Sequence, residues 1–245
     1  MSTITDAPDA SGQQLGGSPL PAVVDWALAV AIALGGLVWI VGGSALAFLV
    51  DRAVLAEGIE GGTVSVTFLS VDLTESELLE VSSAVVSWAG IGLVLIGVGM
   101  VLFAGGYAIR RRRALRRYRA AGEGSSFGSF VVLGAVASAV LSFLPFSPAF
   151  GGALAGYLER GESERSVGAG ALSGLLTILP FVGLVLFTAG GLLAGLRGVT
   201  GPGLTVFVVT SVILTLAAGT AISAGLGAIG GYAGGRFAER RTSAE

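Results

Sequence analysis

The 245-residue chain contains 41 glycines, is 53% hydrophobic and only 12% charged, and has a formal net charge of −2. So few charges, with glycines set inside long apolar runs, are atypical of a soluble domain and predict an all-helical integral membrane protein. Cysteine, histidine and lysine are absent, which excludes disulfides, thiolate metal sites and the commonest general base.

The N-terminal segment 1–21 predicts a disordered tail, because it is rich in Gly, Ser and Pro and its only charges are Asp6 and Asp9. The apolar stretch at about 27–50 follows. It is longer than the core of a signal peptide and has no positive residue ahead of it, so it predicts an uncleaved first membrane span.

An acidic segment, 51–83, separates this span from the next. It has a single base, Arg52, and seven acids: Asp51, Glu57, Glu60, Asp72, Glu75, Glu77 and Glu80. Within it, "TVSVTFLSV" at 63–71 largely alternates polar and apolar residues, which indicates a half-buried β-strand. Such a strand needs a partner, either 53–59 of the same loop or another subunit.

The second span is predicted to begin with a capping box, Thr74 followed three residues later by Glu77, and to run to Ile109. Seven bases in ten residues then follow: Arg110, Arg111, Arg112, Arg113, Arg116, Arg117 and Arg119. Because short arginine-rich loops stay in the cytoplasm, we expect the N-terminus and segment 110–119 inside and loop 51–83 outside the cell membrane. Contact with anionic lipid is the alternative role of these arginines, and no nucleic-acid partner is expected.

The remaining chain has three apolar blocks, 127–158, 166–196 and 204–235. "PFSP" at 145–148 should split the first block into spans near 127–144 and 149–159, since proline interrupts helical hydrogen bonds. Pro180 alone predicts only a kink in the second block. The count is therefore six spans, with five as the alternative; six keeps the arginines of the C-terminal "RFAERR" in the cytoplasm.

Glycines four residues apart are the main motif of this part. "GALAGY" at 152–157 returns as "GAIGGY" at 227–232. Residues at i and i+4 share a helix face, and small residues there let two helix backbones approach closely. The predicted helix-packing glycines are Gly152, Gly156, Gly170, Gly174, Gly191, Gly195, Gly227 and Gly231.

"GLGAIG" at 225–230 matches a dinucleotide-binding pattern but lacks the preceding strand and the following acidic residue that such a site needs.

"PFSPAFGGALAGYLERGESERSVGAGALSGLL" at 145–176, with the closing "GAIGGYAGGR", resembles a family of small haloarchaeal integral membrane proteins classed as a domain of unknown function. The resemblance covers about 127–241 and implies a four-span module without an assigned activity. We therefore divide the chain into the tail 1–21, a two-span unit 22–126, the glycine-rich module 127–241 and the last residues 242–245.

No enzymatic activity, cofactor or metal is expected, because the apolar blocks hold no paired carboxylates and no base that could activate a nucleophile. The favoured role is structural or interactive, through small-residue helix packing within the bilayer, with itself as a homo-oligomer or with a membrane protein partner. A small-solute channel or uncoupled transporter is the alternative, since hydroxyls such as that of Thr177 can line a pore. For these hydroxyls, however, a hydrogen bond to their own helix is the favoured interpretation.

Overall fold

The computed structural model describes residues 22–61, 74–121, 127–159, 163–197 and 201–242, and its regular structure in these ranges is helical. The helices are α1 (Ala22–Leu49), α2 (Arg52–Glu60), α3 (Glu75–Ala121), α4 (Phe127–Val140), α5 (Ser147–Glu159), α6 (Ser163–Gly195) and α7 (Pro202–Thr242). The predicted helical class is confirmed for these residues. The predicted strand at 63–71 lies outside them, and 53–59, considered as its partner, belongs to α2.

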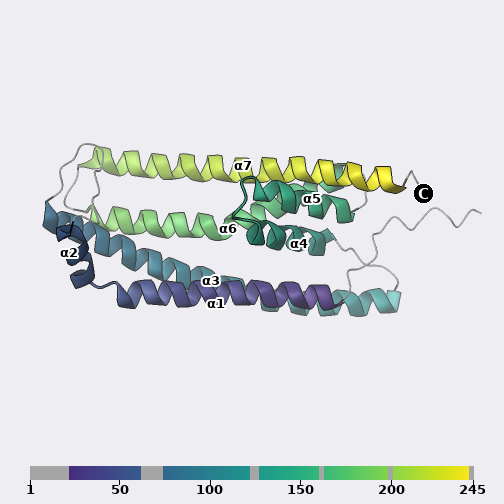
Figure 1. Ribbon diagram of the computed structural model, residues 1–245, viewed down its shortest axis with the longest axis horizontal. Coiled ribbons are helices and arrows are strands. Elements are labelled where there is room, and N and C mark those ends of the chain that lie inside the picture. Colours follow the sequence, from purple (N-terminus) through teal and green to yellow (C-terminus); the bar gives the residue numbers. More distant parts are fainter. Residues whose placement is uncertain (1–21, 62–73, 122–126, 160–162, 198–200, 243–245) are drawn as a thin grey trace, which may run out of the picture.

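Four helices, α1, α3, α6 and α7, are long and apolar enough to cross a membrane. α1 is the shortest of the four with 28 residues, which at 1.5 Å per residue gives ~42 Å against a hydrocarbon core of about 30 Å. The four run side by side along the long axis of the molecule (Figure 1). α1 packs on α3, α3 on α6 and α6 on α7, so the two halves of the chain form one continuous bundle.

Charge separates the two ends of this bundle. The end of α3, the start of α6 and the end of α7 lie together at one end, opposite α2 (Figure 1). This first end carries the arginines of segment 110–119, Arg165 and the arginines of the C-terminal helix, and we call it the arginine-rich end. The opposite end carries acids of α2 and of the first turns of α3, and we call it the acidic end.

The helices α4 and α5 do not support the predicted count of six spans, or the alternative of five, because four helices of the described residues are long and apolar enough to cross a membrane. "PFSP" does break the helix, as predicted, but the pieces have only 14 and 13 residues. At 1.5 Å per residue each is ~20 Å long, too short for a ~30 Å core. The two form a hairpin that starts and finishes near the arginine-rich end and turns beside the middle of α6 and α7 (Figure 1). The described chain therefore has four long helices and one half-depth hairpin.

The hairpin turn, 141–146, is apolar and faces outward. Phe143 and Phe146 are 76% and 65% exposed, as expected for side chains in contact with lipid. Phe146 adopts a positive φ of 68°, a conformation that costs a non-glycine residue about 1 kcal/mol. The reversal lets α5 begin at Ser147 with Pro148 in its first turn, where a proline lacks no needed hydrogen bond. The amide of Leu144 donates to the carbonyl of Leu141 at 2.8 Å, which limits the number of unpaired backbone groups in lipid.

Cysteine labelling tests the half-depth hairpin in this naturally cysteine-free chain. We expect Ser142→Cys, at the turn, to resist a membrane-impermeant maleimide added from either side, because the turn lies beside the middle of α6 and α7, which we expect at the bilayer centre. Glu57→Cys should react only from the side of the acidic end and Glu164→Cys only from the side of the arginine-rich end. Reaction of Ser142→Cys from the acidic side would contradict the hairpin and restore six spans.

The predicted start of the second span is confirmed. The amide and hydroxyl of Thr74 donate to Glu77 Oε2 at 2.8 and 2.7 Å, and the Glu77 amide donates back to Thr74 Oγ1 at 3.4 Å. These reciprocal bonds form a capping box. α3 then runs beyond Ile109 and continues through the arginines to Ala121. α6 remains one helix with Pro180 inside it, as predicted.

Candidate functional site

The two copies of the glycine hexapeptide lie against each other. Gly152 of α5 faces Gly227 of α7, and Gly156 faces Gly231, so both contacts join residues 75 positions apart. A Cβ added at Gly152 would lie 2.8 Å from Gly227 Cα, and one added at Gly156 would lie 2.7 Å from Gly231 Cα. α5 and α7 both run toward the arginine-rich end (Figure 1). The arrangement is therefore the equivalent, within one chain, of two parallel helices that meet through the same small-xxx-small motif.

α6 completes this contact as a third helix. Gly170 of α6 also packs against Gly227 and Gly231, and Gly174 packs against the backbone of Ser223. The Ser223 hydroxyl donates to the Gly174 carbonyl at 2.8 Å, a bond between two membrane helices. Such a bond contributes about 0.6 kcal/mol on average in bilayers. Three helix backbones thus meet at one glycine junction, formed by 152–156, 170–174 and 227–231.

The remaining predicted pair, Gly191 and Gly195, lies on a different surface of α6 and packs against α3. A Cβ at Gly191 would lie 2.8 Å from Trp88 Cβ, and one at Gly195 would lie 2.7 Å from Val81 Cα. All eight predicted packing glycines therefore contact another helix of the same chain. The pair at 191 and 195 joins the two-span unit to the glycine-rich module.

A second set of close glycine contacts escaped the sequence analysis. Gly36 of α1 faces Gly97 of α3, and Gly43 faces Gly90. A Cβ at Gly36 would lie 2.7 Å from the Gly97 carbonyl oxygen, and one at Gly90 would lie 2.9 Å from that of Gly43. The partners on each helix are seven residues apart, the period of left-handed helix packing. A search for glycines seven apart, and not only four apart, would have found them.

Hydroxyl groups in the module are used for packing. The Thr177 hydroxyl donates to the Ser173 carbonyl of its own helix at 2.9 Å, in line with the favoured interpretation of the threonines. Within the described residues, the hydroxyl oxygens of Ser138, Ser166 and Ser173 are buried without a hydrogen-bond partner. Each lies against a glycine of a neighbouring helix: Gly151, Gly235 and Gly134, respectively. Small side chains thus fill the notches that the glycines leave.

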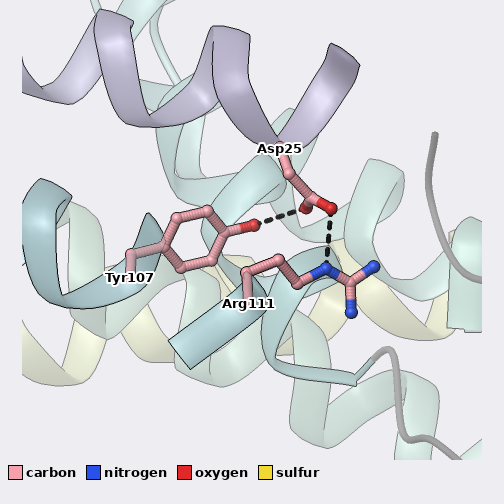
Figure 2. A network of polar contacts seen from close by, with 3 residues as sticks. All are labelled: Asp25, Tyr107 and Arg111. Carbon is pink, nitrogen blue, oxygen red and sulfur yellow. Dashed lines mark hydrogen bonds and ion pairs between the residues drawn. The ribbon is translucent and has the colours of Figure 1, made fainter. Parts of the chain in front are cut away.

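A buried ionic cluster links α1 to α3 near the arginine-rich end. Asp25, in the first turn of α1, accepts a hydrogen bond from Arg111 Nε at 2.6 Å and one from the Tyr107 hydroxyl at 2.8 Å (Figure 2). The side chains of Arg111 and Asp25 are only 9% and 7% exposed. Ionisable groups buried among membrane helices are expensive unless they are paired, so their presence marks a candidate functional site.

The cluster sets Arg111 apart from the arginines around it. Arg110, Arg112, Arg113 and Arg116 are exposed, whereas Arg111 is buried; the side chains of Arg117 and Arg119 lie outside the described part of the structure. Asp25 lies just before the predicted first span, about 27–50, and the sequence analysis did not single it out. One signal was available: Asp25 is an acid at the same predicted membrane face as the arginines, and adjacent antiparallel spans bring such groups to equal depth.

A second ion pair joins the end of the hairpin to α6. Glu159, the last residue of α5, is buried and lies 3.6 Å from Arg165 Nε at the start of α6. Burial raises the pKa of the Glu159 carboxyl, and the positive charge of Arg165 opposes the shift. Glu159 faces an arginine, whereas Glu164 is exposed. These two acids, on either side of the connection between α5 and α6, therefore do not converge on a common point.

Comparison with known proteins bears on the glycine-rich module. No curated protein and no solved structure matches the chain. The predicted resemblance of residues 127–241 is confirmed at the level of a family without assigned activity: residues 129–237, somewhat under half of the chain, match a family described as "Family of unknown function (DUF5518)".

Proposed function

We propose that this multi-pass membrane protein has a structural or interaction role and no catalytic activity. The observation that carries the proposal is the backbone-to-backbone packing at the glycine junction, where α5, α6 and α7 approach too closely for even a methyl group to fit between them. Close packing of this kind favours a rigid bundle and disfavours a solute path along these three helices.

The outer surface of the bundle is the surface that remains available for an interaction. Large apolar side chains on all four long helices are exposed; examples are Val38 at 69%, Leu102 at 71%, Leu179 at 64% and Leu214 at 68%. Since the glycine faces are used within the chain, a second copy or another membrane protein would contact these larger side chains instead. The predicted partner contact therefore moves from the glycine faces to these larger apolar side chains.

For location, we propose the cell membrane with the N-terminus and the arginine-rich end in the cytoplasm. The support is the charge separation described above, because basic residues are retained on the cytoplasmic side. We also infer a haloarchaeal kinship for the module; the exclusive use of arginine as the basic residue and the acidic segment 51–83 are compatible with it.

A small-solute channel is the second candidate, and the half-depth hairpin is the observation that favours it. Discontinuous helices that end at mid-membrane recur in transporters and channels, where their ends point at a substrate. In this chain, however, the described turn presents phenylalanines to the surroundings.

Flux and native mass measurements separate the two candidates. Purified protein in proteoliposomes is expected to give no solute flux above that of empty vesicles, while a native mass spectrum of gently extracted protein shows a defined oligomer or a second polypeptide. A bare monomer together with solute flux would overturn the structural role and favour the channel.

A further inference from the structure

A groove of about 720 Å³ runs between α5 and α7. Its lining is mostly apolar and includes Ala153, Leu154 and Phe237, and it ends at Tyr157, Arg240 and Arg241. The groove is open along its length to the surroundings of the bundle. The groove therefore combines an apolar trough with a cationic end.

Glycine packing creates this groove. Gly234 of α7 touches the backbone of α5, where an added Cβ would lie 2.9 Å from the Tyr157 amide nitrogen. With no side chain at Gly234, the floor is backbone, and the walls are the side chains that stand on either side of it, Leu154 and Tyr157 on α5 and Phe237 on α7. Two parallel helices in such close contact leave an open, shallow groove, against which an acyl chain can pack.

The charged end has the composition of a headgroup site. Arg241 Nη1 donates to the Tyr157 hydroxyl at 3.4 Å, so an arginine and a phenol meet at the mouth of the groove. Arg236 lies over the ring of Tyr232, 5.1 Å from its centroid, one turn earlier on α7. Residues 236–241 contain three arginines and one acid, Glu239. Tyrosine and arginine at this position are typical of the interface between hydrocarbon and headgroups.

We propose that this groove binds one phospholipid with an anionic headgroup. Arg240 and Arg241 hold the phosphate through charge-assisted hydrogen bonds, and one acyl chain lies along Ala153, Leu154 and Phe237. A free phosphate would leave the apolar part of the groove empty, whereas a phospholipid fills it with an acyl chain and pairs its phosphate with the arginines. The site is separate from segment 110–119, and it goes beyond the structural role proposed above by assigning a ligand.

The test uses the full chain in detergent, equilibrated with mixed vesicles of phosphatidylglycerol and phosphatidylcholine in equal amounts and then examined by native mass spectrometry. We expect one retained phosphatidylglycerol per chain. Arg240→Gln with Arg241→Gln should lower its retention about tenfold, as loss of charge-assisted bonds implies. The matched control, Arg52→Gln with Arg197→Gln, removes two exposed arginines that lie outside both the groove and segment 110–119 and should retain the lipid.

A second variant tests the acyl-chain part without changing any charge. Leu154→Trp fills the trough and should lower retention by a similar factor, with the thermal unfolding midpoint as the check that the variant folds. Equal loss in the Arg52/Arg197 control would overturn the proposal, because it would show general charge attraction. Retention that persists in Leu154→Trp but is abolished by excess inorganic phosphate would identify a phosphate site and overturn the lipid assignment.

Discussion

Replacing Gly227 with valine is expected to lower the unfolding midpoint of the detergent-extracted protein by about 6–12 °C, while Gly225→Val changes it little. Both glycines lie in α7, two residues apart. A Cβ at Gly227 would contact the Gly170 carbonyl and lie 3.2 Å from the Gly174 amide nitrogen, whereas a Cβ at Gly225 would meet nothing within 4 Å. The pair thus separates helix packing from the change in intrinsic helix propensity.

The size of the effect follows from what surrounds Gly227. Its neighbours are backbone atoms of α5 and α6, which cannot rotate out of the way as a side chain can. Overpacking a well-filled interior costs about 1–3 kcal/mol, and the upper end applies where backbones must separate. For a protein of this size, each 1 kcal/mol shifts the midpoint by about 2–4 °C.

The measurement is thermal unfolding followed by intrinsic tryptophan fluorescence or by loss of the monodisperse peak in size exclusion. Equal midpoints for the two variants would show that the junction tolerates separation of its helices. That result would contradict the rigid bundle on which the proposed structural role rests.

The second large effect is expected at the buried ion pair. Arg111→Met leaves the Asp25 carboxylate buried without its cation, and Asp25→Leu leaves the Arg111 guanidinium without its anion. Loss of one member of a buried pair typically destabilises by about 3–5 kcal/mol. The double variant removes both charges and should return to within about 1–2 kcal/mol of the original protein, because an apolar pair of similar volume needs no desolvation.

A double-mutant cycle of unfolding midpoints measures this coupling, with Arg112→Met as the control. Arg112 follows Arg111 in α3 but is exposed, so its replacement should shift stability by no more than about 0.5 kcal/mol. If the effects of the two single changes simply added in the double variant, Asp25 and Arg111 would not act as a pair.

Local features were predictable from sequence where the interaction is local. Thr74 and Glu77 are three residues apart, so a capping box needs only one turn of helix. "PFSP" breaks the helix through the backbone chemistry of its own prolines, and Pro180 is tolerated as a single one. The i, i+4 glycines identified surfaces that allow close approach, because the spacing alone places them on one helix face.

The hairpin depended on lengths that the apolar pattern did not reveal. As a single helix, the block 127–158 would be ~48 Å long, more than one span of about 30 Å needs and less than two spans need. The position of the turn, with α4 ending at Val140 and α5 beginning at Ser147, leaves two segments that each reach only half-way. The number of membrane crossings is even in both cases. A half-depth hairpin and two full spans both return the chain to the side on which it started.

The sequence by itself determined that this protein belongs in a bilayer, where its helices begin and break, and which residues are small enough for close contact, since these properties follow from composition and local spacing. Only the tertiary structure decided which surfaces meet. Gly152 lies opposite Gly227, Gly36 opposite Gly97, and Arg111 is buried against Asp25 while its neighbours are exposed. These choices depend on the register and rotation of whole helices relative to one another, which result from the sum of many weak contacts over distant parts of the chain.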